Sequence, residues 1–103
     1  MRIEWTDPAI ADLAAIRDYI ARDSEQYATR FVGRIIEAVE KLTSFPELGR
    51  RVPESRNRDR VRELLFQNYR IIYRITANRI QIITVLHGAR DLRRMKPKPW
   101  EVI

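Results

Sequence analysis

The alternation of side chains between Tyr69 and Leu86 constrains the fold more than any other feature of this sequence. Mostly apolar residues occupy every second position of 69–75 and of 80–86, which is the period of a β-strand. A two-residue turn at Ala77-Asn78 would join the two segments in a hairpin that pairs Tyr73 with Ile82 and Arg70 with Val85. The predicted core face of this hairpin consists of Tyr69, Ile71, Tyr73, Ile75, Ile80, Ile82, Thr84 and Leu86.

The opposite face of the hairpin mixes arginines with aliphatic side chains. Its members are Asn68, Arg70, Ile72, Arg74, Gln81, Ile83, Val85 and His87. A sheet face of this kind is either covered by a partner or used as a site. We therefore expect Ile72, Ile83 and Val85 to be exposed, and an acidic partner to bury them.

A second two-residue turn at Gln67-Asn68 extends the sheet upstream. It would pair Glu63 with Ile72 and place Glu63 diagonal to both Arg70 and Arg74, within reach of ion pairing. Two interpretations remain open. The charges form either a salt-bridged sheet surface or a site that recognises phosphate or an acidic partner.

The N-terminal half predicts a strand and two helices. Residues 2–5 alternate as a short strand, and Thr6-Asp7-Pro8 is typical of a helix start. Helical spacing of apolar residues predicts one helix over 8–22 and a second over 25–43, broken at Asp23-Ser24. The short connection predicts an antiparallel helical hairpin packed on the sheet. The fold class is therefore α+β, with an N-terminal strand, the hairpin, and an antiparallel sheet of three further strands.

Composition limits the classes of site. The 103 residues, 45% of them hydrophobic, predict a single domain over 1–103 whose last segment, 89–103, is a basic tail. The absence of cysteine and the single histidine exclude disulfides and the usual zinc sites. We expect no metal and no cofactor. With no signal peptide and no apolar run of ~18 residues, we expect a cytoplasmic protein without a membrane partner.

Positive charge is concentrated on both sides of the strand block. The net charge is +6, and it comes from two arginine-rich segments, 49–62 and 89–103. Guanidinium groups bind phosphate and carboxylate bidentately, so these segments indicate a nucleic-acid or acidic protein partner. The candidate contact residues are Arg56, Arg58, Arg60, Arg62, Arg90, Arg93 and Arg94, together with Arg70 and Arg74 of the sheet. Trp100 either packs on the body of the protein or anchors a partner.

One set of residues could perform catalysis. The sequence has no serine or cysteine nucleophile with a recognisable base and no glycine-rich phosphate loop. Glu63, Arg70, His87 and Arg90 could cleave RNA without a metal, with arginines stabilising the charged transition state and His87 or Glu63 transferring protons. The alternative is that His87 is a structural residue at a strand end.

Three segments resemble one family of proteins. Arg62-Glu63-Leu64, the segment from Asn68 to Ile75, and the segment from Val85 to Leu92 are similar to the RelE/ParE superfamily of bacterial toxins. The resemblance covers essentially the whole chain. It implies the order of elements derived above, and it implies the toxin of a type II toxin–antitoxin pair, neutralised by a cognate acidic antitoxin.

The superfamily divides by target. RelE-like members cut mRNA on the ribosome, and ParE-like members inhibit DNA gyrase. Arg70 and Arg90 match functional arginines of the RelE branch, but its catalytic lysines fall at Val61 and Glu63, and neither is basic. The resemblance therefore favours gyrase inhibition, without an enzymatic activity. The alternatives are a ribosome-dependent mRNA endonuclease and a binding module that is not toxic.

Overall fold

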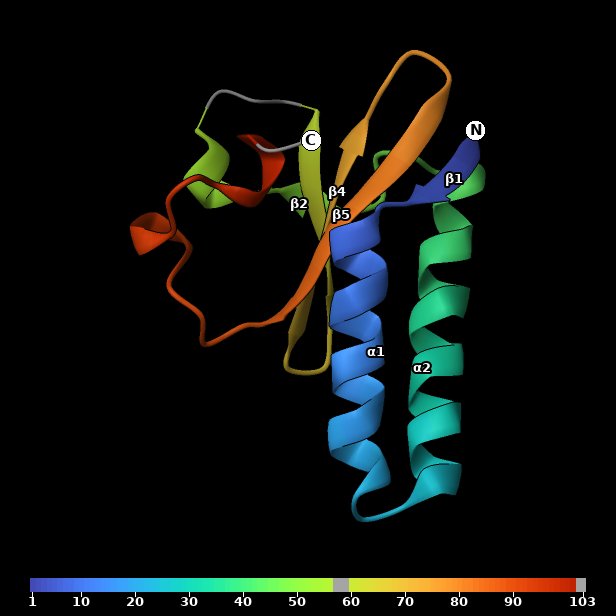
Figure 1. The fold of residues 1–103 in the computed structure, drawn as a ribbon. Helices are drawn as coiled ribbons and strands as arrows, with labels where there is room; N and C mark the ends of the chain where they lie inside the picture. Colours follow the sequence, from blue (N-terminus) through green and yellow to red (C-terminus); the bar gives the residue numbers. More distant parts are fainter. Residues whose placement is uncertain (57–59, 102–103) are drawn as a thin grey trace.

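The computed structural model describes residues 1–56 and 60–101, and these form three layers (Figure 1). A helical hairpin lies on one face of a sheet, and the C-terminal segment lies on the other face. In spatial order the strands are β1 (Arg2–Trp5), β5 (Arg79–His87), β4 (Tyr69–Ile75), β3 (Val61–Phe66) and β2 (Arg50–Arg51). The predicted α+β class is confirmed. The two-residue β2 was not predicted, and β1 pairs parallel to β5 while the other pairs are antiparallel.

The helices begin where the sequence predicts. Helix α1 (Asp7–Ala21) has Thr6 as its N-cap, and the Thr6 hydroxyl accepts from Ala9 N while it donates to the carbonyl of Ile82 in β5. Helix α2 (Glu25–Glu40) is capped by Ser24, whose hydroxyl accepts from Tyr27 N. Its last turn tightens into a 3₁₀-helix, Lys41–Thr43. Both predicted helix ranges are confirmed to within a few residues.

The two strand turns also form as predicted, but one register is wrong. Glu63 pairs with Ile72 and Tyr73 with Ile82, as expected. Arg70, however, pairs with Leu86 and not with Val85. The reason is a β-bulge: Ile72 pairs with Thr84 and the next residue, Tyr73, with Ile82, so that Ile83 is an extra residue on β5. Beyond the bulge the side chains change face.

The helical hairpin covers an apolar core. The buried residues of this cluster are Ala9, Ile16, Phe31, Ile35, Val39 and Leu42 from the helical half and Ile71, Tyr73, Ile80, Ile82 and Val85 from the sheet. Val85 belongs here because of the bulge. The expectation that Val85 is exposed is wrong, since only 3% of it is accessible.

The opposite face of the sheet is covered by the chain itself. Ile72 and Ile83 are 0% and 1% exposed, so the expectation that a partner would find them on the surface is wrong. They pack with Leu92 and Trp100 of the C-terminal segment, and Trp100 is only 4% exposed. Lys98 fastens this segment, because its ammonium donates to the carbonyls of Leu92 and Arg93, each at 2.7 Å. Trp100 is thus a core residue and not a free anchor.

None of the helices within residues 1–56 and 60–101 is long and apolar enough to cross a membrane.

Candidate functional site

A cluster of buried charges lies on the sheet face that the C-terminal segment covers. Arg70 Nε donates to Glu63 Oε1 at 2.6 Å, and Arg50 Nε donates to Glu63 Oε2 at 2.7 Å. The Glu63 side chain is 0% exposed and that of Arg70 is 9% exposed. Both oxygens of Glu63 therefore accept from arginines, and the carboxylate is engaged on both sides inside the fold.

Glu54 completes the coordination of Arg70. It belongs to a 3₁₀-helix, Pro53–Ser55, and its carboxylate accepts from Arg70 Nη2 at 2.8 Å and from Nη1 at 3.2 Å. The hydrogen bonds with Arg70 hold the pKa of Glu54 below its usual value, against the opposing effect of burial. The same bonds, followed by those with Glu63, raise the pKa of Arg70. Arg70 is therefore a permanently charged group clamped between two carboxylates.

The sequence identified half of this cluster. The Glu63–Arg70 pair was predicted, but the second cation on Glu63 is Arg50 where Arg74 was expected. Arg74 donates to Gln81 Oε1 instead, with Nη2 at 2.7 Å. Glu54 and Arg50 were missed because the loop that carries them has no periodicity that would place it over the sheet.

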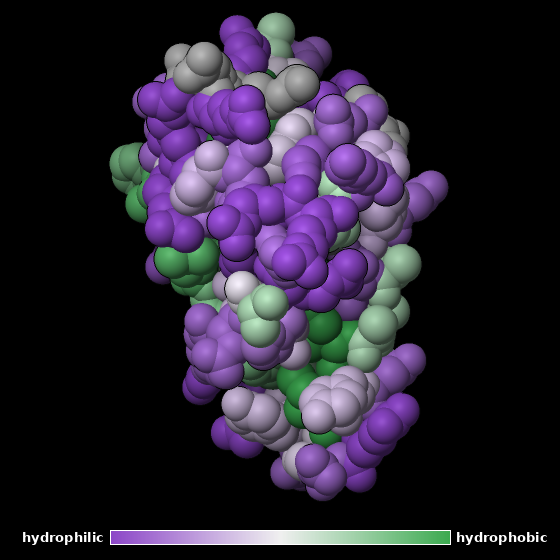
Figure 2. Space-filling model, turned by 90° about the vertical axis from the view of Figure 1, so that its left-hand side faces the viewer, coloured by the Kyte–Doolittle hydropathy of each residue, from purple (hydrophilic) through white to green (hydrophobic). Residues whose placement is uncertain are grey.

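His87 and Arg90 lie beside this cluster, at the rim of an apolar groove. The groove separates α1 from the C-terminal segment, and its lining includes Ile16, Tyr69, Val85, His87, Arg90 and Met95. Figure 2 shows this side of the molecule, where an apolar hollow opens in the lower half of a mostly hydrophilic face. The ring of His87 stands edge-on to Tyr69, with centroids 5.6 Å apart, and its Nδ1 accepts from Ala89 N. Arg90 also lines the hollow above Arg70.

The remaining candidate arginines are distributed around the surface. Arg56, Arg60, Arg93 and Arg94 are exposed, and the last two lie 3.4 Å from Asp91. Arg62 is half-buried and donates to the carbonyl of Gly49 at 2.9 Å. Arg58 lies outside the described residues. Contact of these arginines with a target or an antitoxin stays a prediction.

The geometry limits the chemistry of the cluster. Within the described part of the chain, no three His, Asp or Glu side chains converge as metal ligands would. Glu63 has neither exposure nor a free oxygen with which to accept a proton from a substrate. Of the four residues proposed for catalysis, only His87 and Arg90 are exposed.

Comparison with known proteins identifies the family. The sequence model of the ParE toxin of type II toxin–antitoxin systems, parDE, matches residues 3–92. The chain belongs to the ParE toxin family. This ParE-family toxin is 36% identical over 90 residues to the toxin RelE2 of Caulobacter vibrioides, and the match covers 86% of this chain and 97% of that protein.

A solved structure agrees with the family. This toxin superimposes with a TM-score of 0.71 on a chain of the chromosomal ParDE toxin–antitoxin system from P. aeruginosa, with 29% identity. The match covers 84% of this toxin and 95% of that chain. The predicted RelE/ParE resemblance is confirmed, and so is the function as the toxin of a type II toxin–antitoxin system with a cognate antitoxin as partner.

Proposed function

We propose that this ParE-family toxin arrests growth by binding and inhibiting DNA gyrase, and that it does not cut mRNA. The observation that carries the proposal is the state of Glu63 and Arg70. Both are buried, and each is bonded to an opposite charge. A general base must reach the proton that it abstracts, and a phosphate-binding arginine must have free donors. Within this pair Glu63 has no oxygen without a partner, and three of the five N–H donors of Arg70 are committed to carboxylates.

The exposed residues nearby fit a binding surface. His87 and Arg90 lie at the rim of the apolar groove between α1 and the C-terminal segment. Protein interfaces combine apolar contact with a charged rim in which arginine is frequent. We therefore assign His87 and Arg90 to target contact.

Two assays with the purified toxin test the target. The toxin should inhibit supercoiling by gyrase or trap gyrase on cleaved DNA. It should leave mRNA intact in a translating extract. Codon-positioned cleavage of mRNA with gyrase unaffected would overturn the proposal.

The His87→Ala variant separates the two mechanisms further. A nuclease that uses His87 for proton transfer should lose roughly 10²–10⁴-fold in rate. For a gyrase-binding toxin the half-inhibitory concentration should rise about tenfold or less, since one contact at the rim of an interface contributes little. Arg90→Ala should behave like His87→Ala in the supercoiling assay, and Arg30→Ala on the exposed face of α2 is the matched control.

The second candidate is a ribosome-dependent mRNA endonuclease. The similarity to a toxin named RelE2 favours it, since RelE-like members cut mRNA. On this alternative His87 and Arg90 would act on RNA without Glu63. The 10²–10⁴-fold loss described above would support it.

A further inference from the structure

A rigid turn exposes apolar side chains away from the groove. In the turn that follows the 3₁₀-helix Lys41–Thr43, Leu48 N donates to the carbonyl of Phe45 at 3.0 Å. Phe45 and Leu48 are 64% and 53% exposed. They line one hollow together with Met1, Ser44, Pro46, Glu47 and Ile75.

The turn is fixed from below by Tyr73. Its hydroxyl donates to the carbonyl of Pro46 at 2.8 Å and accepts from Gly49 N at 2.9 Å. Tyr73 is fully buried, and burial raises the pKa of its hydroxyl, so the group remains a protonated donor. The backbone at Gly49 passes so close that an added Cβ would lie 2.5 Å from the carbonyl oxygen of Glu63. The turn is therefore held in one conformation while its largest apolar side chains face solvent.

Preorganised apolar side chains are typical of interface anchors. A rigid turn loses little conformational entropy when a partner binds, which improves affinity. Inside the protein, Phe45 and Leu48 gain little from their position, because more than half of each remains accessible. The structure thus favours a role for these side chains outside their own chain.

Charge identifies the kind of partner. Arg51, Arg60 and Arg62 line a second hollow that shares Glu47 and Ile75 with the first. Arg51 and Arg62 are paired across β2 and β3, so two guanidinium groups leave adjacent strands at this end of the sheet. Among the described lining residues Glu47 is the single carboxylate. Such a surface is complementary to a chain that carries both carboxylates and apolar side chains.

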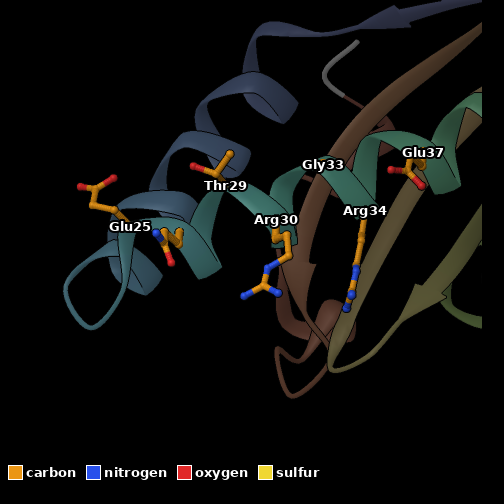
Figure 3. A pocket seen from close by; sticks show the side chains of 7 residues that line it. Glu25, Thr29, Arg30, Gly33, Arg34 and Glu37 are labelled. Atoms are coloured by element: carbon orange, nitrogen blue, oxygen red, sulfur yellow. The ribbon is translucent and has the colours of Figure 1, made fainter.

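The exposed face of α2 has a different character. Arg30 and Arg34 extend from this helix on either side of Gly33, and Glu25 and Glu37 lie at the ends of the same shallow hollow (Figure 3). Two arginines and two glutamates lie there together, and none of the lining residues is a large apolar side chain. Substitutions on this face therefore change charge without removing an apolar anchor.

We propose that the surface of Phe45, Leu48, Arg51, Arg60 and Arg62 binds an acidic segment of the cognate antitoxin. Apolar side chains of that segment would cover Phe45 and Leu48, and its carboxylates would pair with the arginines. This inference rests on the antitoxin partnership of the family and not on the gyrase target proposed above.

The test measures antitoxin affinity for surface variants of the full-length toxin. The probe is the product of the reading frame adjacent to the toxin gene, purified and titrated by calorimetry. The double variant Phe45→Ser, Leu48→Ser should bind it about 10–100-fold more weakly, as loss of two apolar anchors requires. Arg60→Glu should also weaken binding and reduce its dependence on salt. All these side chains are exposed, so the thermal unfolding midpoints should match the wild type.

Matched control variants test whether the loss of antitoxin affinity is specific to the proposed surface. Tyr19→Ser removes an aromatic side chain of α1 that is 67% exposed, and Arg30→Glu reverses a charge on α2. Both should leave antitoxin affinity within about threefold of the wild type. Unchanged affinity of the Phe45 and Leu48 double variant would overturn the proposal, and so would an equal loss in the controls.

Two further readouts distinguish other occupants. If the double variant loses toxicity without antitoxin but keeps its antitoxin affinity, the surface binds the target and the proposal is wrong. If sedimentation shows a wild-type dimer that the double variant abolishes, with antitoxin affinity unchanged, a second copy of the toxin occupies it. Failure of the gyrase assays leaves these binding measurements interpretable, because they do not involve gyrase.

Discussion

The two faces of the sheet are buried by different means. On one face two helices cover a row of aliphatic and aromatic side chains that form the larger apolar cluster. On the other face a short 3₁₀-helix and the C-terminal segment cover a smaller apolar cluster that lies beside the ion pairs of Arg70, Glu63, Glu54 and Arg50.

The difference shows that the two faces of one small sheet can be stabilised by different kinds of interaction. The stability of the helix-covered face depends on the apolar area removed from water, so changes of polar surface residues have little effect on it. The tail-covered face depends on charges that must stay paired once they are buried. We expect charge and pH to change the stability of the tail-covered face, and side-chain volume to change that of the helix-covered face.

The largest expected effect is the loss of a carboxylate on the tail-covered face. Glu63→Ala leaves Arg70 buried with one carboxylate fewer and should lower the free energy of unfolding by about 3–5 kcal/mol. Urea unfolding followed by circular dichroism measures it.

On the helix-covered face, Ile35→Ala should lower the free energy of unfolding by about 2–5 kcal/mol through the cavity that it leaves. Glu37→Ala, an exposed carboxylate on α2, is the control and should change stability by less than about 0.5 kcal/mol. If Glu63→Ala resembles this control, the two faces do not differ as described.

A smaller effect is expected where the chain passes closest to the sheet. Gly49→Ala should cost about 1–3 kcal/mol, because the new methyl group would meet the carbonyl of Glu63 and the ring of Tyr73. Gly33→Ala in α2 is the matched substitution, and a Cβ there would have no atom within 4 Å. It should stabilise the toxin by about 0.4–1 kcal/mol. Equal shifts of the two thermal midpoints would contradict the close approach at Gly49.

The smallest effect concerns the pH dependence of the tail-covered face. Arg70 holds the pKa of Glu54 below 4.5, the value expected in the unfolded chain. This contribution to stability is therefore present above pH 4.5 and is lost as the pH falls through the lower folded pKa. Glu54→Gln should destabilise the toxin at pH 7, and the difference from wild type should shrink by pH 3. Glu37→Gln should give no such trend. A difference for Glu54→Gln that is constant with pH would show that its role is not electrostatic.

Local patterns were sufficient to predict most of the framework. The capping residues Thr6 and Ser24 mark both helix starts, and the two-residue turns fix the pairing of Glu63 with Ile72 and of Tyr73 with Ile82. The β-bulge at Ile83 could not be foreseen, since no glycine or break in the alternation announces it. The strict period of two therefore assigns Val85 and Leu86 to the wrong faces.

The site was predicted only where its parts lie close in sequence. Glu63 and Arg70 are joined by one hairpin, and their ion pair was expected. Glu54 reaches Arg70 through a loop, and Trp100 reaches Ile72 through a segment with no regular period. Such contacts depend on the path by which an irregular segment returns to the sheet, and no periodic pattern in the sequence predicts that path. Consequently Ile72 and Ile83, which the sequence pattern assigns to an exposed partner-binding surface, lie in the interior of the protein.

The parallel pairing of β1 with β5 affects how the molecule can be made. Arg2–Trp5 is synthesised well before its neighbour in the sheet, Arg79–His87, which comes nearly eighty residues later. Helix α1 likewise packs on β5. The helical hairpin can form early, but its apolar side has no complete surface to cover until most of the chain has been synthesised. The nascent chain therefore becomes a toxin late in translation, and a fragment that stops before β5 lacks both the strand that joins β1 to β4 and the part of the core that β5 supplies.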